Sequence, residues 1–377
     1  MRFVYFTHSL LSCWNHGNAH FLRGVLRELV ARGHNVRSYE PEDGWSRQNL
    51  LSELQGPAAQ RQFGQVFPDL APCLHFLQDD YDAMLDGADV VLVHEWNEPA
   101  LVQAIGQRRK QGGRFTLLFH DTHHRAVTDP RTIGALDLSG YDGVLAFGAT
   151  LAEVYRRAGW GDRAFIWHEA ADTRHFRPPG VEGERTGAVW IGNWGDNERT
   201  EELRSFLLTP IRTLGMALDV YGVRYPDSAL ADLTAAGARY RGWLPNARAP
   251  EVFARHMMTV HVPRRAYASE LRGIPTIRMF EALACGIPLV SAPWTDSESL
   301  FRTGSDYLSA ATPEIMETEL DRLRADPGLR QALARSGLET IQARHSCAHR
   351  VDELLGIVQG LSGGKQGLSG RRQEGVG

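Results

Sequence analysis

The stretch from residue 2 to residue 39 decides the fold, through the runs "RFVYFT" (2–7), "FLRGVLRELVARGH" (21–34) and "NVRSY" (35–39). The first and third runs are rich in aromatic and β-branched residues, as β-strands are. Apolar residues recur at helical spacing in the middle run, at Phe21, Val25, Leu26, Leu29 and Val30. The helix ends at Gly33. Strands this apolar on both faces belong to a parallel sheet that helices cover.

The alternation continues along the chain and then restarts after a polar segment, "HEAADTRHFRPPGVEGERTG" at 168–187, which is rich in Pro and Gly. Strand-like runs lie before and after this segment, at 89–93, 115–119, 143–147, 164–167, 188–192, 217–222, 258–262 and 288–291. Helical stretches are expected at 197–208, 227–236, 313–325, 328–343 and 347–358. The sequence therefore predicts an α/β fold of two doubly wound, Rossmann-like domains that face a central cleft.

The expected boundaries are a first domain over 1–172, a linker over 173–186, a second domain over 187–345, a helix over 346–360 and a tail over 361–377. We expect the helix to pack back toward the first domain. The tail is rich in Gly, Ser and charged residues, so it is expected to be disordered.

Composition excludes several classes of protein. The 377 residues are 43% apolar, enough for two cores, and the formal charge of −4 with mixed signs does not indicate a nucleic-acid surface. The cysteines, Cys13, Cys73, Cys285 and Cys347, form no C-x-x-C pair and are expected to be free thiols. Without a signal-like or membrane-spanning run, we expect a cytoplasmic, soluble protein, with peripheral membrane contact left open.

Ligands of open parallel sheets bind beyond the carboxyl ends of the strands, where three loops stand out. They are "SLLSCWNHGNAH" (9–20), "HDTHHR" (120–125) and "GNWGDNER" (192–199). Small residues such as Gly192 allow backbone N–H groups to face an anion, although a purely structural turn is an alternative. Neither glycine-containing loop has the G-x-G-x-x-G pattern of nicotinamide cofactors.

The loop at 120–125 also suggests a metal site, because it contains His120, Asp121, His123 and His124. A strand end does not supply the i, i+4 pair of a metal-binding helix, and no further ligand is evident. A polar loop that faces substrate is favoured over a metal site and over a merely solvated loop.

The run "FEALACGIPLVS" (280–291) contains one carboxylate, Glu281, near the end of a predicted helix. Its position off the apolar face favours a solvated glutamate that pairs with Arg278 at i, i+3. The alternative is a carboxylate that binds a vicinal diol such as ribose. Arginines near this part of the chain would suit a diphosphate: Arg199, Arg224, Arg264, Arg265, Arg272 and Arg278.

Several motifs together resemble the GT-B glycosyltransferases of the large retaining group. The run "FEALACGIPLVS" resembles their second-domain signature, and other runs agree in order: "DVVLVHEW" (89–96), "FTLLFHD" (115–121), "WHEAADTRHFRP" (167–178) and "RYRGWLPN" (239–246). The runs "TIRMFEALACG" and "RHSCAHRVDELL" are similar to the spore-maturation-type subgroup.

This resemblance implies an acceptor-side first domain and a second domain that binds a nucleotide-diphosphate sugar, UDP- or GDP-linked. Glu281 would bind the ribose, Trp243 and Leu244 would flank the base, and His120 would face the transferred sugar. The implied donor-binding residues are Glu281, Arg278, Gly192, Asn193, Trp194, Tyr221, Trp243, Leu244, Arg265, Gly273, Ile274, Pro275 and Thr276. The implied catalytic residues are His120, Asp121 and Arg199, the acceptor-side residues are His16, Gly17 and Asn18, and no metal ligand or further cofactor is expected.

The sequence departs from the family pattern at two places. Gly273 stands eight positions before Glu281, where the family has a second glutamate, and the nearest acid is Glu270. Asn193 and Arg199 stand in place of an Arg and Lys pair. The helix that contains Glu281 is expected to begin at 274–276, with Pro275 in its first turn.

The expected activity is metal-independent, hexosyl-type transfer with retention, and Asp121 or His16 would be the base if the reaction inverted instead. The acceptor is a saccharide, a lipid-linked saccharide, another small molecule or a protein. A nucleotide-sugar epimerase and a non-catalytic scaffold or coat-associated protein are the alternatives.

Overall fold

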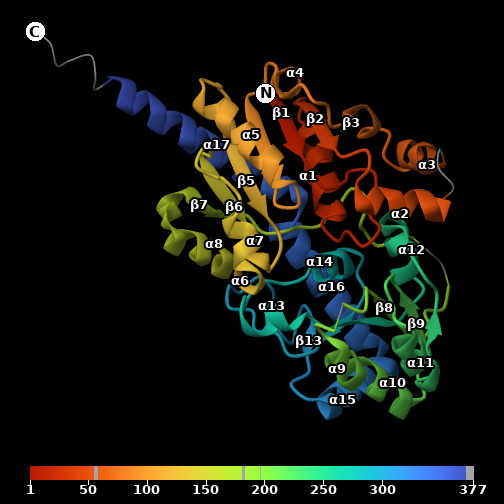
Figure 1. Ribbon diagram of the computed structural model, residues 1–377. Helices are drawn as coiled ribbons and strands as arrows, with labels where there is room; N and C mark the ends of the chain where they lie inside the picture. Colours follow the sequence, from red (N-terminus) through yellow and green to blue (C-terminus); the bar gives the residue numbers. More distant parts are fainter. Residues whose placement is uncertain (55–57, 181–182, 196, 371–377) are drawn as a thin grey trace, which may run out of the picture. The chain divides into compact units, whose positions relative to one another are not determined.

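The computed structural model describes residues 1–54, 58–180, 183–195 and 197–370, which form two compact units, each built on a parallel β-sheet (Figure 1). The first unit contains residues 1–12, 25–168 and the chain from Ala348. The second contains residues 13–24 and 169–347. The predicted class, two parallel α/β sheets, is confirmed.

The first sheet has the strand order β3-β2-β1-β4-β5-β6-β7. Its strands are β1 (Arg2–Phe6), β2 (Asn35–Glu40), β3 (Leu74–Phe76), β4 (Val90–His94), β5 (Thr116–Asp121), β6 (Gly143–Ala146) and β7 (Ala164–Ile166). Phe6 of β1 aligns with Tyr39 of β2 on one side and Val93 of β4 on the other. The strand order reverses between β1 and β4, so ligands of this sheet are expected to bind beyond the carboxyl ends of these two strands.

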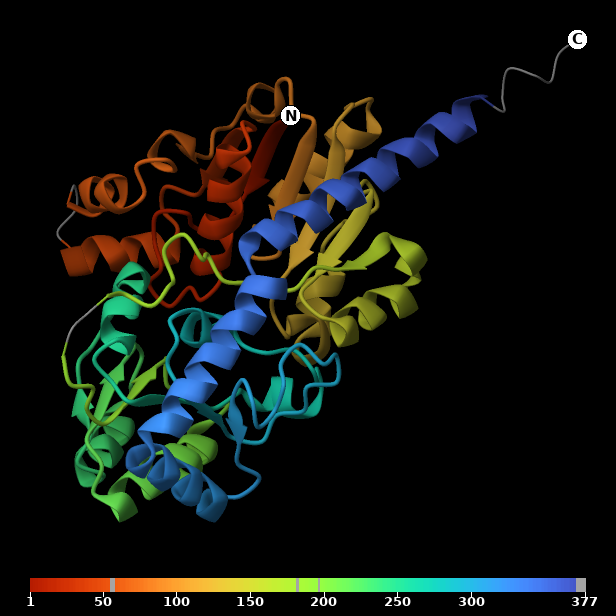
Figure 2. The same ribbon diagram turned by 180° about the vertical axis from the view of Figure 1, so that it is seen from behind.

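Helices connect these strands on both faces, since crossovers that run in opposite directions along a sheet place their helices on opposite faces. The helices of this part of the chain are α1 (Ala19–Ala31), α2 (Trp45–Leu54), α3 (Ala58–Val66), α4 (Tyr81–Leu85), α5 (Pro99–Lys110), α6 (Arg125–Thr128), α7 (Pro130–Gly134), α8 (Ala149–Tyr155) and α17 (Cys347–Gly370). Figure 2 shows α17 running across one face of the first sheet. Its Arg350 carbonyl accepts a hydrogen bond from Trp167 Nε1 at 2.8 Å, and Asp352 pairs with Arg32 of the segment after α1.

The second sheet has the order β10-β9-β8-β11-β12-β13 and reverses between β8 and β11. Its strands are β8 (Ala188–Ile191), β9 (Leu218–Tyr221), β10 (Arg239–Tyr240), β11 (Met258–His261), β12 (Leu289–Ser291) and β13 (Leu308–Ser309). Its helices are α9 (Thr200–Leu203), α10 (Thr209–Leu214), α11 (Asp227–Ala235), α12 (Ala249–Phe253), α13 (Arg265–Ser269), α14 (Ile277–Ala284), α15 (Pro313–Ala325) and α16 (Pro327–Arg344).

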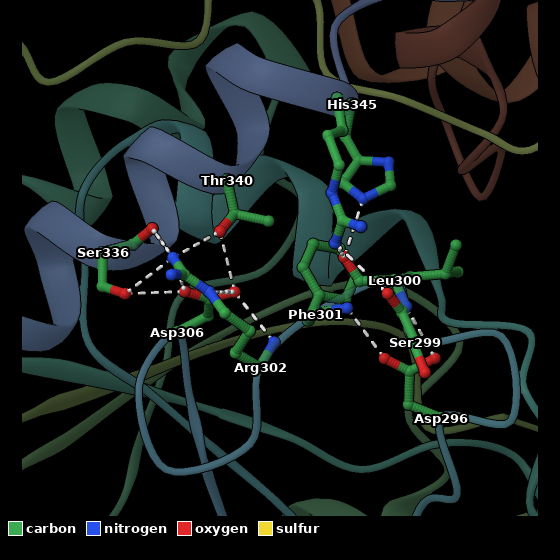
Figure 3. Close-up of polar contacts among 10 residues, drawn as sticks. Asp296, Ser299, Leu300, Phe301, Arg302, Asp306, Ser336, Thr340 and His345 are labelled. Atoms are coloured by element: carbon green, nitrogen blue, oxygen red, sulfur yellow. Dashed lines mark hydrogen bonds and ion pairs between the residues drawn. The ribbon is translucent and has the colours of Figure 1, made fainter.

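The loop between β12 and β13 is fastened to α16 through a buried carboxylate (Figure 3). Asp306 accepts hydrogen bonds from Ser336 Oγ at 2.7 Å, Thr340 Oγ1 at 2.8 Å and the Arg302 backbone N–H at 2.8 Å. Burial alone would raise the pKa of Asp306, but these hydrogen bonds outweigh burial and lower it. Asp296 closes the other end of the loop by accepting from nearby backbone N–H groups. The loop therefore has a fixed backbone.

Several elements differ from the sequence prediction. In place of the single helix expected at 197–208, the chain forms three consecutive helical pieces: α9, a wider π-helical turn over Arg204–Leu208, and α10. The helical segment therefore continues to Leu214. The last helix continues to Gly370, beyond the expected end at 360, and the expected tail from 371 lies outside the described residues, as do 181–182 of the linker.

All four cysteines are free thiols, as predicted. Among the described residues, no helix is long and apolar enough to cross a membrane.

Candidate active site

Arg199 joins two loops at the point where the order of the second sheet reverses. Its Nη1 donates to the Val262 carbonyl at 3.0 Å, after β11, and its Nη2 donates to the Asn193 carbonyl at 2.6 Å, after β8. Burial, with Arg264 nearby, lowers the pKa of Arg199 to about 9, so the guanidinium remains charged at neutral pH. Its Nε is buried and has no protein partner among the described residues. One buried cation with an unused donor therefore lies at this sheet edge.

The loop after β8 is held tightly. The Gly192 carbonyl accepts from Tyr225 Oη at 2.7 Å, and Asn193 Oδ1 accepts from the Val223 backbone N–H at 3.0 Å. Asn193 Nδ2 donates to Asn15 Oδ1. The predicted donor-binding residues Gly192 and Asn193 are thus fixed by their neighbours and present backbone rather than long side chains.

Two other predicted donor-binding side chains point elsewhere. Trp194 lies in the core of the second unit and donates from Nε1 to Thr200 Oγ1 at 2.9 Å. Arg265 is exposed and pairs with Glu202, Nε to Oε1, at 2.7 Å. Tyr221 is half-buried at the end of β9.

Glu281 lies on α14 and is completely buried, with 0% of its surface exposed. Its Oε1 accepts from Asn246 Nδ2 at 2.6 Å, and Arg278 forms an ion pair with Oε2. His20 Nδ1 lies 3.4 Å from Oε1, but burial lowers the pKa of His20 to about 3, so the ring is neutral. The i, i+3 pair with Arg278 is confirmed, whereas the solvated glutamate is wrong, because residues distant in sequence cover this face of the helix.

The segment at residues 13–24 belongs to the second unit and contains the predicted acceptor-side residues His16, Gly17 and Asn18. Asn18 Nδ2 donates to Glu169 Oε1 at 3.3 Å, and Glu169 was not a candidate from sequence. Burial, with a smaller effect of the Glu281 charge, raises the pKa of Glu169 to about 8, although the hydrogen bond from Asn18 and the charge of Arg278 oppose this rise. The sequence signals for Glu169 are its place just after the apolar run at 164–167 and inside the run at 167–178 that resembles the family.

Gly273 has a backbone conformation that requires glycine, with φ at +96°. A Cβ at this position would overlap Ser297 Oγ and would approach Ser297 Cβ to 3.3 Å. The backbone at Gly273 therefore leaves no room for the glutamate of the family pattern.

The segment before α14 also differs from the prediction. The helix begins at Ile277 with Thr276 as its N-cap, so Pro275 precedes the helix instead of lying in its first turn, and that prediction is wrong. Ile274 is buried before this cap, and Thr276 makes no side-chain hydrogen bond to the helix end. Trp243 and Leu244 are half-buried in the loop after β10.

In the first unit, two buried carboxylates lie at the ends of neighbouring strands. Glu95 follows β4 and pairs with Arg125, while Asp121 ends β5 and accepts from Tyr155 Oη at 2.6 Å and from the His123 backbone N–H at 3.0 Å. Burial raises the pKa of Glu95, Asp121 raises it further, and Arg125 opposes both. Burial also raises the pKa of Asp121. The positive charge of Arg125 thus opposes the rise in the pKa of both carboxyl groups.

His120 is completely buried beside these acids, where its Nδ1 is hydrogen-bonded to Tyr5 Oη and its ring packs edge-on against Trp167. Burial lowers the pKa of His120 to about 3, so the ring is neutral. His94 Nε2 lies 3.0 Å from Thr122 Oγ1. Over the described part of the chain, no group of three or more His, Cys, Asp or Glu side chains could hold a metal ion.

Trp96 is the exposed group at this edge, with 42% of its surface open and the Arg125 guanidinium 3.8 Å from the centre of its ring. It follows Glu95 directly. Sequence reasoning noted Trp96 after the strand but did not select it as a site residue.

Comparison with known proteins agrees with this architecture. Residues 199–356 match a family model described as glycosyl transferase-like. No curated protein matches the chain by sequence. Among solved structures, an alpha-glucosyltransferase in complex with UDP and a 13-mer DNA is 12% identical, covers 95% of this chain and 99% of its own, and has a TM-score of 0.68.

Two further structures are similar over their whole length. Sucrose-phosphate synthase from Thermosynechococcus elongatus is 12% identical, with 97% of this chain and 100% of that chain covered and a TM-score of 0.64. A glycosyltransferase from Rickettsia africae is 10% identical, with 96% and 98% covered and a TM-score of 0.61. These likenesses show the GT-B fold. The chain therefore has the GT-B fold, and its residues 199–356 are similar to a family described as glycosyl transferase-like.

Proposed function

We propose that the protein transfers a hexosyl group from a UDP- or GDP-linked sugar to an acceptor hydroxyl, with retention and without a metal ion. The observation that carries this proposal is the buried Glu281–Arg278 pair on α14, inside the segment that matches the glycosyltransferase-like model. UDP is the nucleotide in the alpha-glucosyltransferase structure, which supports a nucleotide donor here.

Glu281 is suited to bind a ribose diol. Each carboxylate oxygen can accept two hydrogen bonds, and in the described structure each has one strong donor, Asn246 or Arg278. Arg278 is partly exposed, so its side chain can turn outward and leave Oε2 to a ribose hydroxyl. The same movement would bring the Arg278 guanidinium to the diphosphate.

Departure of the nucleoside diphosphate places negative charge on the leaving phosphate, and fixed positive groups stabilise that charge in the transition state. Arg278 and the unused Nε of Arg199 are such groups. The N-terminus of α14 is another, because the side chain of its N-cap, Thr276, makes no hydrogen bond to it. These groups would supply the positive charge that metal-dependent enzymes take from a cation.

An inverting reaction would require a base that can take a proton from the acceptor, and the burial and hydrogen bonding of the two candidate bases support retention instead. Asp121 is fully buried and accepts hydrogen bonds from Tyr155 and His123, which leaves it poorly placed to take a proton from an acceptor. His16 is the other candidate base, and it is also buried.

The proposed acceptor is a saccharide, a lipid-linked saccharide, another small molecule or a protein. The formal charge of −4 disfavours a nucleic acid, such as the DNA in the alpha-glucosyltransferase structure. We also propose a cytoplasmic location, with peripheral contact to a membrane if the acceptor is lipid-linked, and kinship with the spore-maturation-type glycosyltransferases.

The test is a panel of UDP- and GDP-hexoses, with binding followed by thermal shift and calorimetry and donor hydrolysis followed by nucleotide release, with and without EDTA. We expect one donor to bind and hydrolyse slowly in EDTA, and Glu281→Gln to abolish both. Glu270→Gln, a change at an exposed acid nearby, is the matched control and should behave as wild type.

Other outcomes decide against the proposal. No binding and no hydrolysis with any donor would favour a non-catalytic scaffold. Release of a free epimerised sugar in the absence of acceptor would favour an epimerase. Transfer to a DNA oligonucleotide, added as one of the acceptors, would overturn the assignment of the acceptor class.

A further inference from the structure

Asn18 and Glu169 form a buried polar pair in the second unit, with 9% and 6% of their surfaces exposed. Asn18 Nδ2 donates to Glu169 Oε1 at 3.3 Å. The other end of the amide, Asn18 Oδ1, is buried and has no hydrogen-bond partner among the residues described. Buried polar atoms in native structures are almost always satisfied, so an unpaired amide oxygen indicates a missing donor.

The pair lies beside the proposed ribose site. The charges of Glu281 and Arg278 both act on the Glu169 carboxyl group, which places it close to α14. His20, two residues after Asn18, approaches the same Glu281. Asn18 and Glu169 therefore lie near the residues that we propose for the ribose and the diphosphate.

Gly17, directly before Asn18, is exposed. Glycine leaves this position without a side chain, and a Cβ there would meet only Ile277 Cγ2, at 3.5 Å.

We infer that Asn18 and Glu169 bind hydroxyl groups of the sugar ring of the donor, which makes them specificity-determining residues for the transferred sugar. A ring hydroxyl can donate to Asn18 Oδ1 and at the same time accept from the Glu169 carboxyl group, so one hydroxyl or two adjacent ones satisfy the pair. With its pKa raised to about 8, Glu169 is protonated at neutral pH and has a proton to donate. Asn18 is thereby assigned to the donor and not, as predicted from sequence, to the acceptor.

A purely structural role would be to fasten residues 13–24 to the rest of the second unit. Two other contacts already do this. His20 Nε2 accepts from the Asp172 backbone N–H at 2.9 Å, and Cys13 Sγ accepts from the Asn246 backbone N–H at 3.3 Å. Neither explains an unpaired oxygen on Asn18, whereas a hydroxyl-bearing ligand does.

The test compares the affinity for the nucleoside diphosphate alone with that for the nucleotide sugar, and the inference rests on the proposed function. Asn18→Leu and Glu169→Ala are expected to weaken the nucleotide sugar at least tenfold and to change the affinity for the nucleoside diphosphate less than twofold. Glu169→Met keeps most of the side-chain volume but has no hydrogen-bond donor, so it should weaken the nucleotide sugar in the same way and covers the case in which the alanine variant does not fold.

Cys13→Ala is the matched control, because it removes another contact of the same segment. A structural role for the pair predicts that all variants lower the melting temperature and weaken both ligands equally, and that result would overturn the inference. If wild type binds nucleotide sugars and the ratio of the two affinities is unchanged in the variants, this inference fails while the proposed function stands. If wild type binds neither ligand, both fail.

Discussion

Replacement of Gly273 by alanine should destabilise the second unit by about 1.5–3 kcal/mol. The backbone there has φ at +96°, where an L-residue costs about 1–2 kcal/mol. The added methyl group would overlap Ser297 Oγ, which must turn away and break its 3.2 Å bond to the Arg272 carbonyl. Loss of one such exposed hydrogen bond costs about 0.5–1 kcal/mol.

The loop that contains Ser297 has little freedom to retreat. The backbone nitrogen of Ser297 would lie only 3.4 Å from the new Cβ, and Asp306 holds the loop to α16 (Figure 3). In a Ser297→Ala background, Gly273→Ala should cost only the backbone part, because the hydroxyl group and its hydrogen bond are already absent; the set is then Gly273→Ala, Ser297→Ala, the double variant and Gly304→Ala. Gly304→Ala is the matched control, since Gly304 has φ at +82° with no heavy atom within 4 Å of a Cβ and should show the backbone cost alone.

Urea unfolding of the four variants, followed by circular dichroism and tryptophan fluorescence, measures these differences. A loss for Gly273→Ala no greater than that for Gly304→Ala would refute the role assigned to Ser297. Gly273→Glu, which introduces the residue of the family pattern, should lower stability further without tightening donor binding. A stable Gly273→Glu protein with a higher donor affinity would refute the whole argument.

Four other changes test the described contacts. Thr340→Val should lower the free energy of unfolding by about 1–2 kcal/mol, because it removes a hydrogen bond to buried Asp306. The pKa of Asp306 is lower in the folded state than in the unfolded chain, so wild type loses stability as the pH falls through that pKa. Asp306→Asn, which has no titrating group there, should lose less stability over the same change of pH, as measured by urea unfolding at pH 3–7. Because the pKa of Glu95 is raised, the folded state keeps a proton that the unfolded chain has already lost, and the stability of wild type should fall from pH 5 to pH 8. Glu95→Gln should reduce this dependence of stability on pH. An unchanged dependence would contradict the raised pKa of Glu95. Trp96→Ala should change the melting temperature little, because the contact between an exposed ring and Arg125 contributes only about 0.5–1 kcal/mol. Thermal unfolding of the variant beside wild type measures this difference.

The short edge strands explain what the sequence pattern missed in the fold. The strand β10 (Arg239–Tyr240) has two residues, both exposed, and β13 (Leu308–Ser309) also has two. Runs this short contain no period of apolar residues, so only pairing with β9 and β12 identifies them as strands. The central strands are long enough and apolar enough to be recognised from the chain alone, as β4 illustrates with five buried residues.

The site was predicted unevenly for a related reason. Strand-end positions such as His120 and Asp121 follow from the strand pattern, whereas the environment of each side chain does not. The helical pattern alone favoured a solvated Glu281, whereas the family resemblance implied a ribose-binding residue; the side chain is buried because His20 and Asn246 complete its surroundings. Glu169 gave almost no signal, since its importance depends on a contact with Asn18 from the start of the chain.

The sequence by itself determined the two-sheet α/β class, the position of the loops at the strand ends and the resemblance of the run at 280–291, because these depend on local periodicity and on order along the chain. Only the tertiary structure decided that residues 13–24 belong to the second unit, that Glu281 is buried and that Gly273 has no room for a side chain. Burial, pKa and the space around a Cβ depend on atoms brought together from distant parts of the chain, and a linear pattern carries no record of those distances.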